Sequence, residues 1–376
     1  MTLRLRHGLY AALLAGAPVI AATLATPVAA QAISKGVGVP LQKAQQLRSG
    51  SAAIAAVNAA RSAAKTPAER AKVAQMAAYV YANSGQYALA AQQLEATGAG
   101  PRQLAPYYYR AGQYDKAIEL ARRAGGTDMQ VVVAQSYLKK GDKKAAAVVY
   151  QQLIRTSGPK MEWLDNLASI QFSYDKSAYL NTVKQMIKID PSPARYKALL
   201  FNLKQQNMSD QAKLVLYALM RQTGNLTEAA DVQDMSKLAI IGGVPGMALG
   251  ALQDAQKANV VSPTDSMITR LVQVSSAQSK AAVAGIVKQP ATPAGRMAVG
   301  NAYFGSDQYP QAAQSYKQVV AANTPNADQA RVLEGIALMR TGDANGARTV
   351  FDSVTRTGGF YDVAQLWSLY ASTHKS

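Results

Sequence analysis

One pattern of spacing recurs along this chain and limits its fold more than any other feature. It is clearest in residues 77–94, AAYVYANSGQYALAAQQL. Small and aromatic residues follow one another there at steps of two, three and four, in the order Ala78, Tyr81, Gly85, Tyr87, Ala90 and Leu94. Because steps of three and four place side chains on one face of a helix, the segment predicts two short amphipathic helices that turn at Gly85.

The same pattern occurs again after this segment and near the end of the chain. It begins at Ala105 with Tyr108, Gly112, Tyr114, Ala117 and Ala121, and at Ala134 with Tyr137, Gly141, Lys143, Ala146 and Tyr150. Two later copies are Gly300, Tyr303, Asp307, Tyr309, Ala312 and Tyr316, and then Gly335, Leu338, Gly342, Ala344, Ala347 and Phe351. One helix pair cannot bury its apolar face alone, so several copies predict pairs that stack on each other.

These residues and their spacing resemble the tetratricopeptide repeat family. The resemblance implies an all-α fold, a right-handed superhelical solenoid of stacked antiparallel helix pairs, with roughly seven or eight pairs in this chain. It also implies that the tyrosines at the repeat positions are packing wedges, namely Tyr81, Tyr87, Tyr108, Tyr114, Tyr137 and Tyr150. No run with a period of two is long enough to predict a β-strand.

Local signals mark where the helices of the first clear pair begin and end. Thr66, Pro67 and Glu69 form a capping box with proline at the first helical position. Gly85 follows the first helix of the pair, where a glycine readily takes the left-handed conformation that ends a helix.

Residues 1–32 have the features of a secretory signal peptide. Arg4 and Arg6 precede an apolar run over residues 8–25, and Ala30-Gln31-Ala32 is a small-x-small cleavage site. The alternative is an uncleaved membrane anchor, but Pro18 interrupts the run, which is shorter than the ~20 residues of a spanning helix. We therefore expect a periplasmic chain that begins near Ile33 and has no transmembrane segment after signal removal.

The remaining sequence divides by its breaks in helical pattern. Residues 33–66 are expected to form a linker and a first weak helix, and residues 67–287 an N-terminal and middle array of tetratricopeptide-like pairs whose register is open over 156–290. Residues 288–295, KQPATPAG, predict a linker because two prolines and a glycine do not continue a helix. Residues 296–376 then carry two regular repeats and a capping helix.

The composition argues against catalysis. The chain has no cysteine and two histidines, of which His7 lies in the predicted signal peptide and His374 near the C-terminus. Histidine is the usual base at neutral pH, and most protein zinc sites use histidine or cysteine. We expect a protein that is not an enzyme and needs neither a metal nor a cofactor.

Basic side chains are concentrated in the first part of the chain. Residues 33–155 contain 17 basic and 6 acidic side chains, whereas residues 291–376 contain 7 and 6. Such asymmetry suggests a charged partner at one end. In the periplasm this partner would be an anionic polysaccharide, a lipid surface or an acidic protein, and not nucleic acid. The alternative is that a basic surface keeps the protein in solution.

The resemblance also implies where a partner binds. Positions beside the wedges on the first helix of each pair face the concave groove, which places seven residues there: Tyr79, Asn83, Arg102, Tyr109, Arg110, Gln135 and Lys139. Arginine, tyrosine and amide groups suit an anionic or polyhydroxylated ligand through hydrogen bonds and stacking. The alternative is an ordinary solvated polar face.

Two functions are consistent with these features. The first is a non-catalytic periplasmic scaffold that binds a protein or peptide in its groove, as part of envelope assembly or exopolysaccharide secretion. The second is direct binding of anionic glycan or lipid surfaces by the basic N-terminal third. Salt dependence distinguishes them, because a polyanion contact weakens steeply as the Debye length falls.

Overall fold

The structure of the chain is a computed structural model that describes residues 33–356 and 359–374. The predicted signal peptide, residues 1–32, lies outside this range. Within the described residues every regular element is a helix and no β-strand occurs, so the predicted all-α fold is confirmed. The chain divides into two compact units, Met1–Gly141 and Asp142–Ser376, called here the first and second unit.

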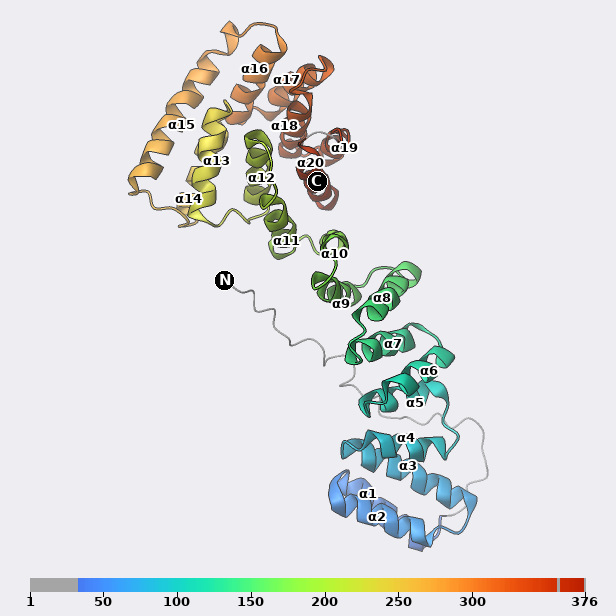
Figure 1. Cartoon of the computed structure of the whole chain (residues 1–376). Coiled ribbons are helices and arrows are strands. Elements are labelled where there is room, and N and C mark those ends of the chain that lie inside the picture. The colour runs from blue at the N-terminus through green and yellow to red at the C-terminus, as the bar shows by residue number, and fades with distance from the viewer. Residues whose placement is uncertain (1–32, 357–358, 375–376) are drawn as a thin grey trace. The chain divides into compact units, whose positions relative to one another are not determined.

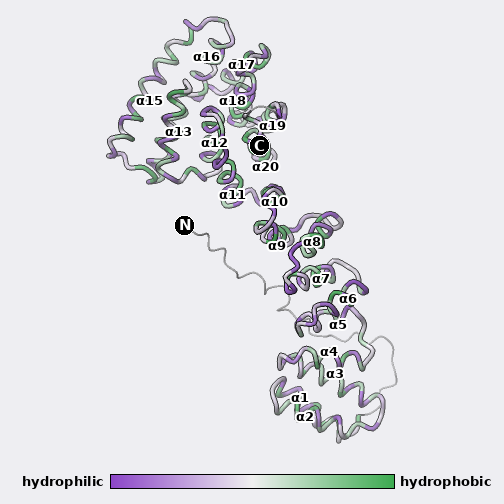
Figure 2. The backbone as a smooth tube through the Cα atoms, in the orientation of Figure 1, coloured by the Kyte–Doolittle hydropathy of each residue, from purple (hydrophilic) through white to green (hydrophobic). Residues whose placement is uncertain are grey.

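The helices of the first unit follow one another as antiparallel neighbours, each packed mainly on the next in sequence (Figure 1). Their apolar and polar residues alternate along the chain, as in amphipathic helices that cover a shared core (Figure 2). The described helices are α1 (Lys35–Leu47), α2 (Gly50–Ala63), α3 (Pro67–Asn83), α4 (Tyr87–Glu95), α5 (Pro101–Arg110), α6 (Tyr114–Ala124) and α7 (Thr127–Lys139).

The second unit continues with further pairs. Its first helices are α8 (Lys143–Ser157), α9 (Met161–Phe172), α10 (Lys176–Ile189), α11 (Pro193–Lys204), α12 (Asp210–Gln222), α13 (Ala229–Ile241), α14 (Pro245–Lys257) and α15 (Ser266–Ala284). After the short 3-10 helix η1 (Ile286–Lys288) come α16 (Pro293–Gly305), α17 (Tyr309–Ala321), α18 (Ala327–Arg340), α19 (Ala344–Asp352) and α20 (Tyr361–Thr373). The segment 288–295, predicted to be a linker, lies inside this unit and runs from the last residue of η1 into the first turn of α16.

The start of α3 has the predicted capping box. The Thr66 hydroxyl accepts from the Glu69 backbone N–H, and the Glu69 carboxylate accepts from the Thr66 N–H. That carboxylate also accepts from the Ser34 hydroxyl at 2.6 Å and from the Ser34 N–H at 3.1 Å. These bonds, with the Ser34 hydroxyl as the largest cause and the Lys65 and Thr66 N–H groups next, lower the pKa of Glu69 to about 2. One carboxylate therefore caps α3 and holds the start of α1.

Glycines end the first helices of the regular pairs as predicted. Gly85, Gly112 and Gly141 have φ angles of 74°, 75° and 82°, which a side chain with a Cβ rarely adopts. The Gly85 N–H donates to the Ala82 carbonyl and the Gln86 N–H to the Tyr81 carbonyl, so the last carbonyls of α3 are satisfied. The tight turn brings α4 back along α3.

The tyrosines at the repeat positions separate into two groups. Tyr81, Tyr108 and Tyr150 are buried, as expected for wedges between helices. Tyr87, Tyr114 and Tyr137 are half-buried at the starts of second helices or near the end of α7. The predicted packing role therefore holds most fully for the first group, and the side chains of the second group are partly exposed.

The second unit is closed by contacts between segments far apart in sequence. Helix α20 packs on α18 and α19 and also on α10 and α12. The buried Trp367 donates from its indole Nε1 to the Val215 carbonyl at 3.0 Å, across 152 residues of sequence. Tyr370 accepts at its hydroxyl from Gln222 Nε2 at 2.8 Å. Helix α12, buried from Leu214 to Met220, thus lies at the centre of this unit.

Two glycines leave room for an aromatic ring between neighbouring helices. Gly300 in α16 faces the Tyr316 ring of α17, and a Cβ at Gly300 would lie 2.7 Å from the ring. Gly335 in α18 faces the Phe351 ring of α19 in the same way. These are the glycine and aromatic positions of the two late copies of the sequence pattern. In both late copies these two positions are therefore in direct contact.

Candidate binding surfaces

Three of the predicted binding residues occupy equivalent places in the first unit. Asn83, Arg110 and Lys139 are the last residues of α3, α5 and α7. Equivalent positions of successive pairs line up along a stacked array. We call this set, together with Tyr79 and Gln135 one helical turn earlier on α3 and α7, the row surface.

The row surface presents polar groups and one exposed ring. Tyr79 is 42% exposed, against 9% for the neighbouring wedge Tyr81. Asn83 donates from Nδ2 to the Arg48 carbonyl at 3.3 Å, which ties the end of α3 to the end of α1. Lys139 is exposed and makes no hydrogen bond or ion pair within the described residues.

Near the middle of the row surface, Arg110 and its neighbour Tyr109 each pack against an aromatic ring. The Arg110 guanidinium carbon lies 5.4 Å from the centre of the Tyr87 ring, a cation–π arrangement. Tyr109 packs against Tyr114, with ring centres 5.9 Å apart and planes at 60°. Burial raises the pKa of Tyr109, so its hydroxyl stays protonated at neutral pH and can donate a hydrogen bond.

Arg102 belongs to the fold and not to the row. It lies at the start of α5, eight residues before Arg110. Its guanidinium forms an ion pair with Asp128 and donates to the Gly125 carbonyl at 2.7 Å. Arg102 therefore fastens the turn between α6 and α7, and its predicted place in the binding groove stays a prediction.

The first unit carries a large excess of unpaired positive charge. Its carboxylates Glu95, Asp115, Glu119 and Asp128 form ion pairs with Lys116, Lys140, Arg123 and Arg102, and Glu69 is held by Ser34, Lys65 and Thr66. Residues 33–141 contain 14 lysines and arginines. Ten of these therefore have no acidic partner among the described residues. Arg110 and Lys139 of the row surface are among the ten.

Lys116 shows how such pairing joins neighbouring helices. Its ammonium bonds the Glu95 carboxylate at 2.8 Å and the Tyr108 hydroxyl at 2.7 Å. The bond from Lys116 lowers the pKa of Glu95, and Glu95 in turn raises the pKa of Lys116. These three side chains come from α4, α5 and α6, and they hold consecutive pairs together.

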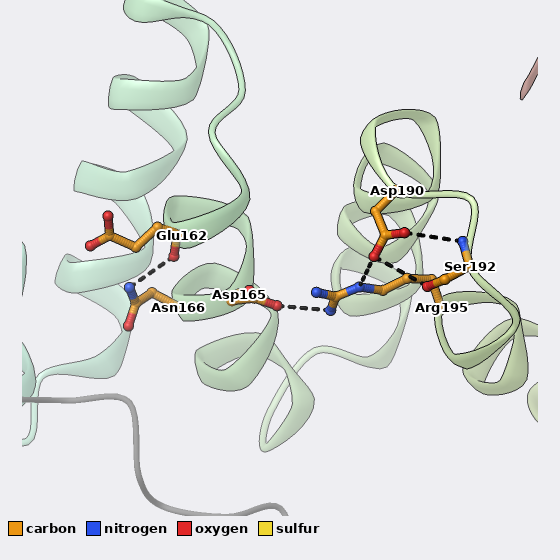
Figure 3. Close-up of polar contacts among 6 residues, drawn as sticks. All are labelled: Glu162, Asp165, Asn166, Asp190, Ser192 and Arg195. Atoms are coloured by element: carbon orange, nitrogen blue, oxygen red, sulfur yellow. Dashed lines mark hydrogen bonds and ion pairs between the residues drawn. The ribbon is translucent and has the colours of Figure 1, made fainter. Parts of the chain in front are cut away.

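In the second unit Arg195 has a similar structural role (Figure 3). It lies between Asp165 of α9, at 2.9 Å from Nη1, and Asp190 before α11, at 3.4 Å from Nε. Asp190 also accepts from the Ser192 N–H and hydroxyl. The cluster links successive helix pairs, and sequence spacing did not indicate it.

The carboxylates of α13 also form ion pairs with neighbouring helices. Asp231, which is buried, pairs with Lys204, and Asp234 pairs with Lys213 at 3.1 Å and accepts from the Tyr217 hydroxyl. Burial is the main cause of the raised pKa of Tyr217. These pairs fasten α11, α12 and α13 to one another.

The described residues contain no group of three or more histidine, cysteine or acidic side chains placed to hold a metal ion. None of the described helices combines the length and apolar character that crossing a bilayer requires.

The sequence profile of the tetratricopeptide repeat family matches residues 298–361, which span α16 to α19. Residues 298–361 of this chain therefore carry tetratricopeptide repeats. The matched segment contains the contact between Gly300 and Tyr316 and that between Gly335 and Phe351. The resemblance inferred from spacing is thus confirmed, and the tetratricopeptide repeat fold is a framework for protein–protein interaction.

Comparison with curated proteins finds no match to this chain. Among solved structures it is similar to a tetratricopeptide repeat protein from Parabacteroides merdae, with 11% identity, 81% of this chain and 100% of that chain covered, and a TM-score of 0.24. It is also similar to yeast Tom70, with 11% identity, 89% and 95% covered, and a TM-score of 0.21. A third is the Cut9–Hcn1 structure, with 15% identity, 90% and 71% covered, and a TM-score of 0.23.

Proposed function

We propose that this tetratricopeptide repeat protein is a non-catalytic periplasmic scaffold that binds an acidic protein partner at the row surface. The observation that carries the proposal is the equivalence of Asn83, Arg110 and Lys139 at the ends of α3, α5 and α7. Repetition of polar ends along a stack suits an extended peptide or loop. Envelope assembly or exopolysaccharide secretion is the setting we propose for such a scaffold.

Export is the first element of this proposal. The predicted cleavage site ends at Ala32, and Ser34 is already bonded to Glu69 through its N–H and its hydroxyl. A chain processed near Ile33 would therefore keep every described contact of α1. Mass spectrometry of the protein from a periplasmic fraction should give an N-terminus within a few residues of Ile33. A stable protein that retains Met1 would contradict it.

Partner binding is tested by charge reversal at the row surface. Arg110→Glu with Lys139→Glu should abolish co-purification of the partner after cross-linking in the native cell. The matched control is Lys35→Glu with Lys43→Glu, which changes the net charge equally at two exposed positions of α1. The row surface is the site if the first variant loses the partner and the second keeps it.

Direct binding of an anionic glycan or lipid surface remains the second candidate. Ten basic side chains without acidic partners in the first unit favour it. Binding to phosphatidylglycerol vesicles or to a polyuronate should then weaken steeply between low and physiological salt, because the Debye length falls. Both charge-reversal variants should weaken it alike, since net charge and not one row drives such binding.

A further inference from the structure

The second unit has a groove that is lined mainly by apolar side chains. It lies between α13 and α15, which pack side by side with α14 joining them (Figure 1). Lys237, Ile240 and Ile241 line it from α13. Met267, Arg270, Leu271 and Val274 line it from α15. Its volume is about 220 Å³.

The groove leaves apolar side chains in water. Ile241 is 79% exposed and Met267 is 45% exposed, while Leu271 is buried at the groove floor. Single exposed apolar residues are normal on protein surfaces. Ile241 and Met267, in contrast, line one apolar hollow from opposite walls, and grouped exposed apolar side chains can mark an interaction site.

The shape of the groove favours a helix as its occupant. The lining residues on α15 follow steps of three, four and seven, and those on α13 steps of three and four, so each wall is one stripe of a helix. A third helix packs into the furrow between two such stripes by its own residues at similar steps. The volume is below the 300 to 1,000 Å³ typical of small-molecule sites, and it suits a few anchoring side chains.

Basic side chains on both walls of the groove indicate the charge of its partner. Lys237 on one wall and Arg270 on the other have no ion pair or hydrogen bond within the described residues. Unpaired cations on both sides of an apolar floor complement carboxylates that flank an apolar stripe. We propose that the groove between α13 and α15 docks an acidic amphipathic helix of a partner protein. This surface is distinct from the row surface, so either proposal can fail without the other.

Labelled synthetic peptides test the proposal on the full chain. The probe is a helical peptide with leucine at i, i+3, i+4 and i+7 and glutamate beside them. The control peptides are a scrambled peptide of the same composition and a peptide with lysine in place of glutamate. Fluorescence anisotropy should show the acidic helical peptide binding at least about tenfold more tightly than either.

Variants locate the binding. Ile241→Glu should weaken the acidic peptide by at least about tenfold, because it places a carboxylate on the apolar wall. Lys237→Glu with Arg270→Glu should reverse the preference to the lysine peptide. Phe201→Glu on α11 is the matched control, since Phe201 is 64% exposed and does not line the groove. All these positions are exposed, so thermal melts should stay near that of the parent protein.

Several results would overturn the proposal. Equal binding of the scrambled peptide, no binding of the acidic one, or equal loss in Phe201→Glu would show that the groove does not select an acidic helix. Binding to phosphatidylglycerol vesicles that Ile241→Glu removes would assign the groove to lipid instead. Concentration-dependent dimerisation that Ile241→Glu removes would assign it to a second copy of the chain.

Discussion

At the scale of single residues, neighbouring tyrosines of α3 differ sharply in what they do. Tyr81 is 9% exposed and packs in the core of α1 to α4, whereas Tyr79 is 42% exposed. Tyr81→Ala should lower the free energy of unfolding by roughly 3 to 5 kcal/mol, as for other large aromatic truncations, and Tyr79→Ala by far less. Urea titrations of both variants measure this. Similar small losses at the two sites would mean that the assigned repeat register is wrong.

A second residue-scale effect concerns Glu334, a carboxylate buried in α18. Burial is the main cause that raises its pKa, and Lys317 and Arg331 oppose that shift. Since the folded-state pKa is above the unfolded one, the ionised group costs stability at neutral pH, and this cost disappears as pH falls below the unfolded pKa of ~4.3. Glu334→Gln should therefore stabilise the protein by roughly 1 kcal/mol at pH 7.

Chemical denaturation at several pH values tests the Glu334 prediction. The gain from Glu334→Gln should be largest at pH 7 and should shrink towards pH 4. A gain independent of pH would attribute it to packing. A loss at pH 7 would mean that Lys317 and Arg331 more than offset the burial of the carboxylate.

At the scale of elements, the contact between Gly300 and Tyr316 decides how closely α16 and α17 approach. Gly300→Ala would gain about 1 kcal/mol of helix propensity but would place a methyl group 2.7 Å from a fully buried ring. Overpacking of this kind costs about 1 to 3 kcal/mol, and Tyr316 is also held by its bond to Asn301 at 2.9 Å. We expect a net loss of about 1 kcal/mol or more.

Gly38 supplies the control for that substitution. It lies in α1, and a Cβ there would be 4.0 Å from the Ile33 side chain, which is ordinary contact. Gly38→Ala should therefore be neutral or stabilising. Thermal melts of the two variants should move in opposite directions. If Gly300→Ala also stabilised the protein, the close packing of α16 on α17 would be in error.

The elements also show what sequence could predict and what it could not. Helix turns at Gly85 and Gly112, and the cap at Thr66, were predictable because they depend on residues close in sequence. The row position of Arg110 followed from repeat spacing. The ion pair of Arg102 with Asp128 did not, because a partner 26 residues away is brought near only by the packed turn.

The groove between α13 and α15 was missed for a related reason. Its two stripes are separated by α14, and neither contains the repeat pattern that marks the first unit. The periodicity of Ile240 and Ile241 is the same whether a stripe faces a core or water. Only the packing of α13 beside α15 shows that these side chains remain uncovered within the described part of the chain.

At the scale of the whole molecule, the two units differ in how far apart in sequence their contacting helices lie. The first unit holds together by contacts between consecutive helices, as expected for stacked pairs. The second unit adds the contacts of α20 with α10 and α12. The hydroxyls of Tyr196 in α11 and Thr373 in α20 also share a hydrogen bond at 3.1 Å. Stability in the second unit should therefore depend on residues very distant in sequence, whereas stability in the first should not.

Trp367→Ala tests this difference directly. The change removes a fully buried ring that stacks on Phe351, together with the indole N–H that donates to the Val215 carbonyl. The expected loss is about 3 to 5 kcal/mol, the range for large aromatic truncations. Hydrogen exchange should speed up in α12 and α20 together, since they share that contact, while protection in α3 to α6 should not change. Faster exchange confined to α20 would show that this helix merely ends the array and does not close the second unit.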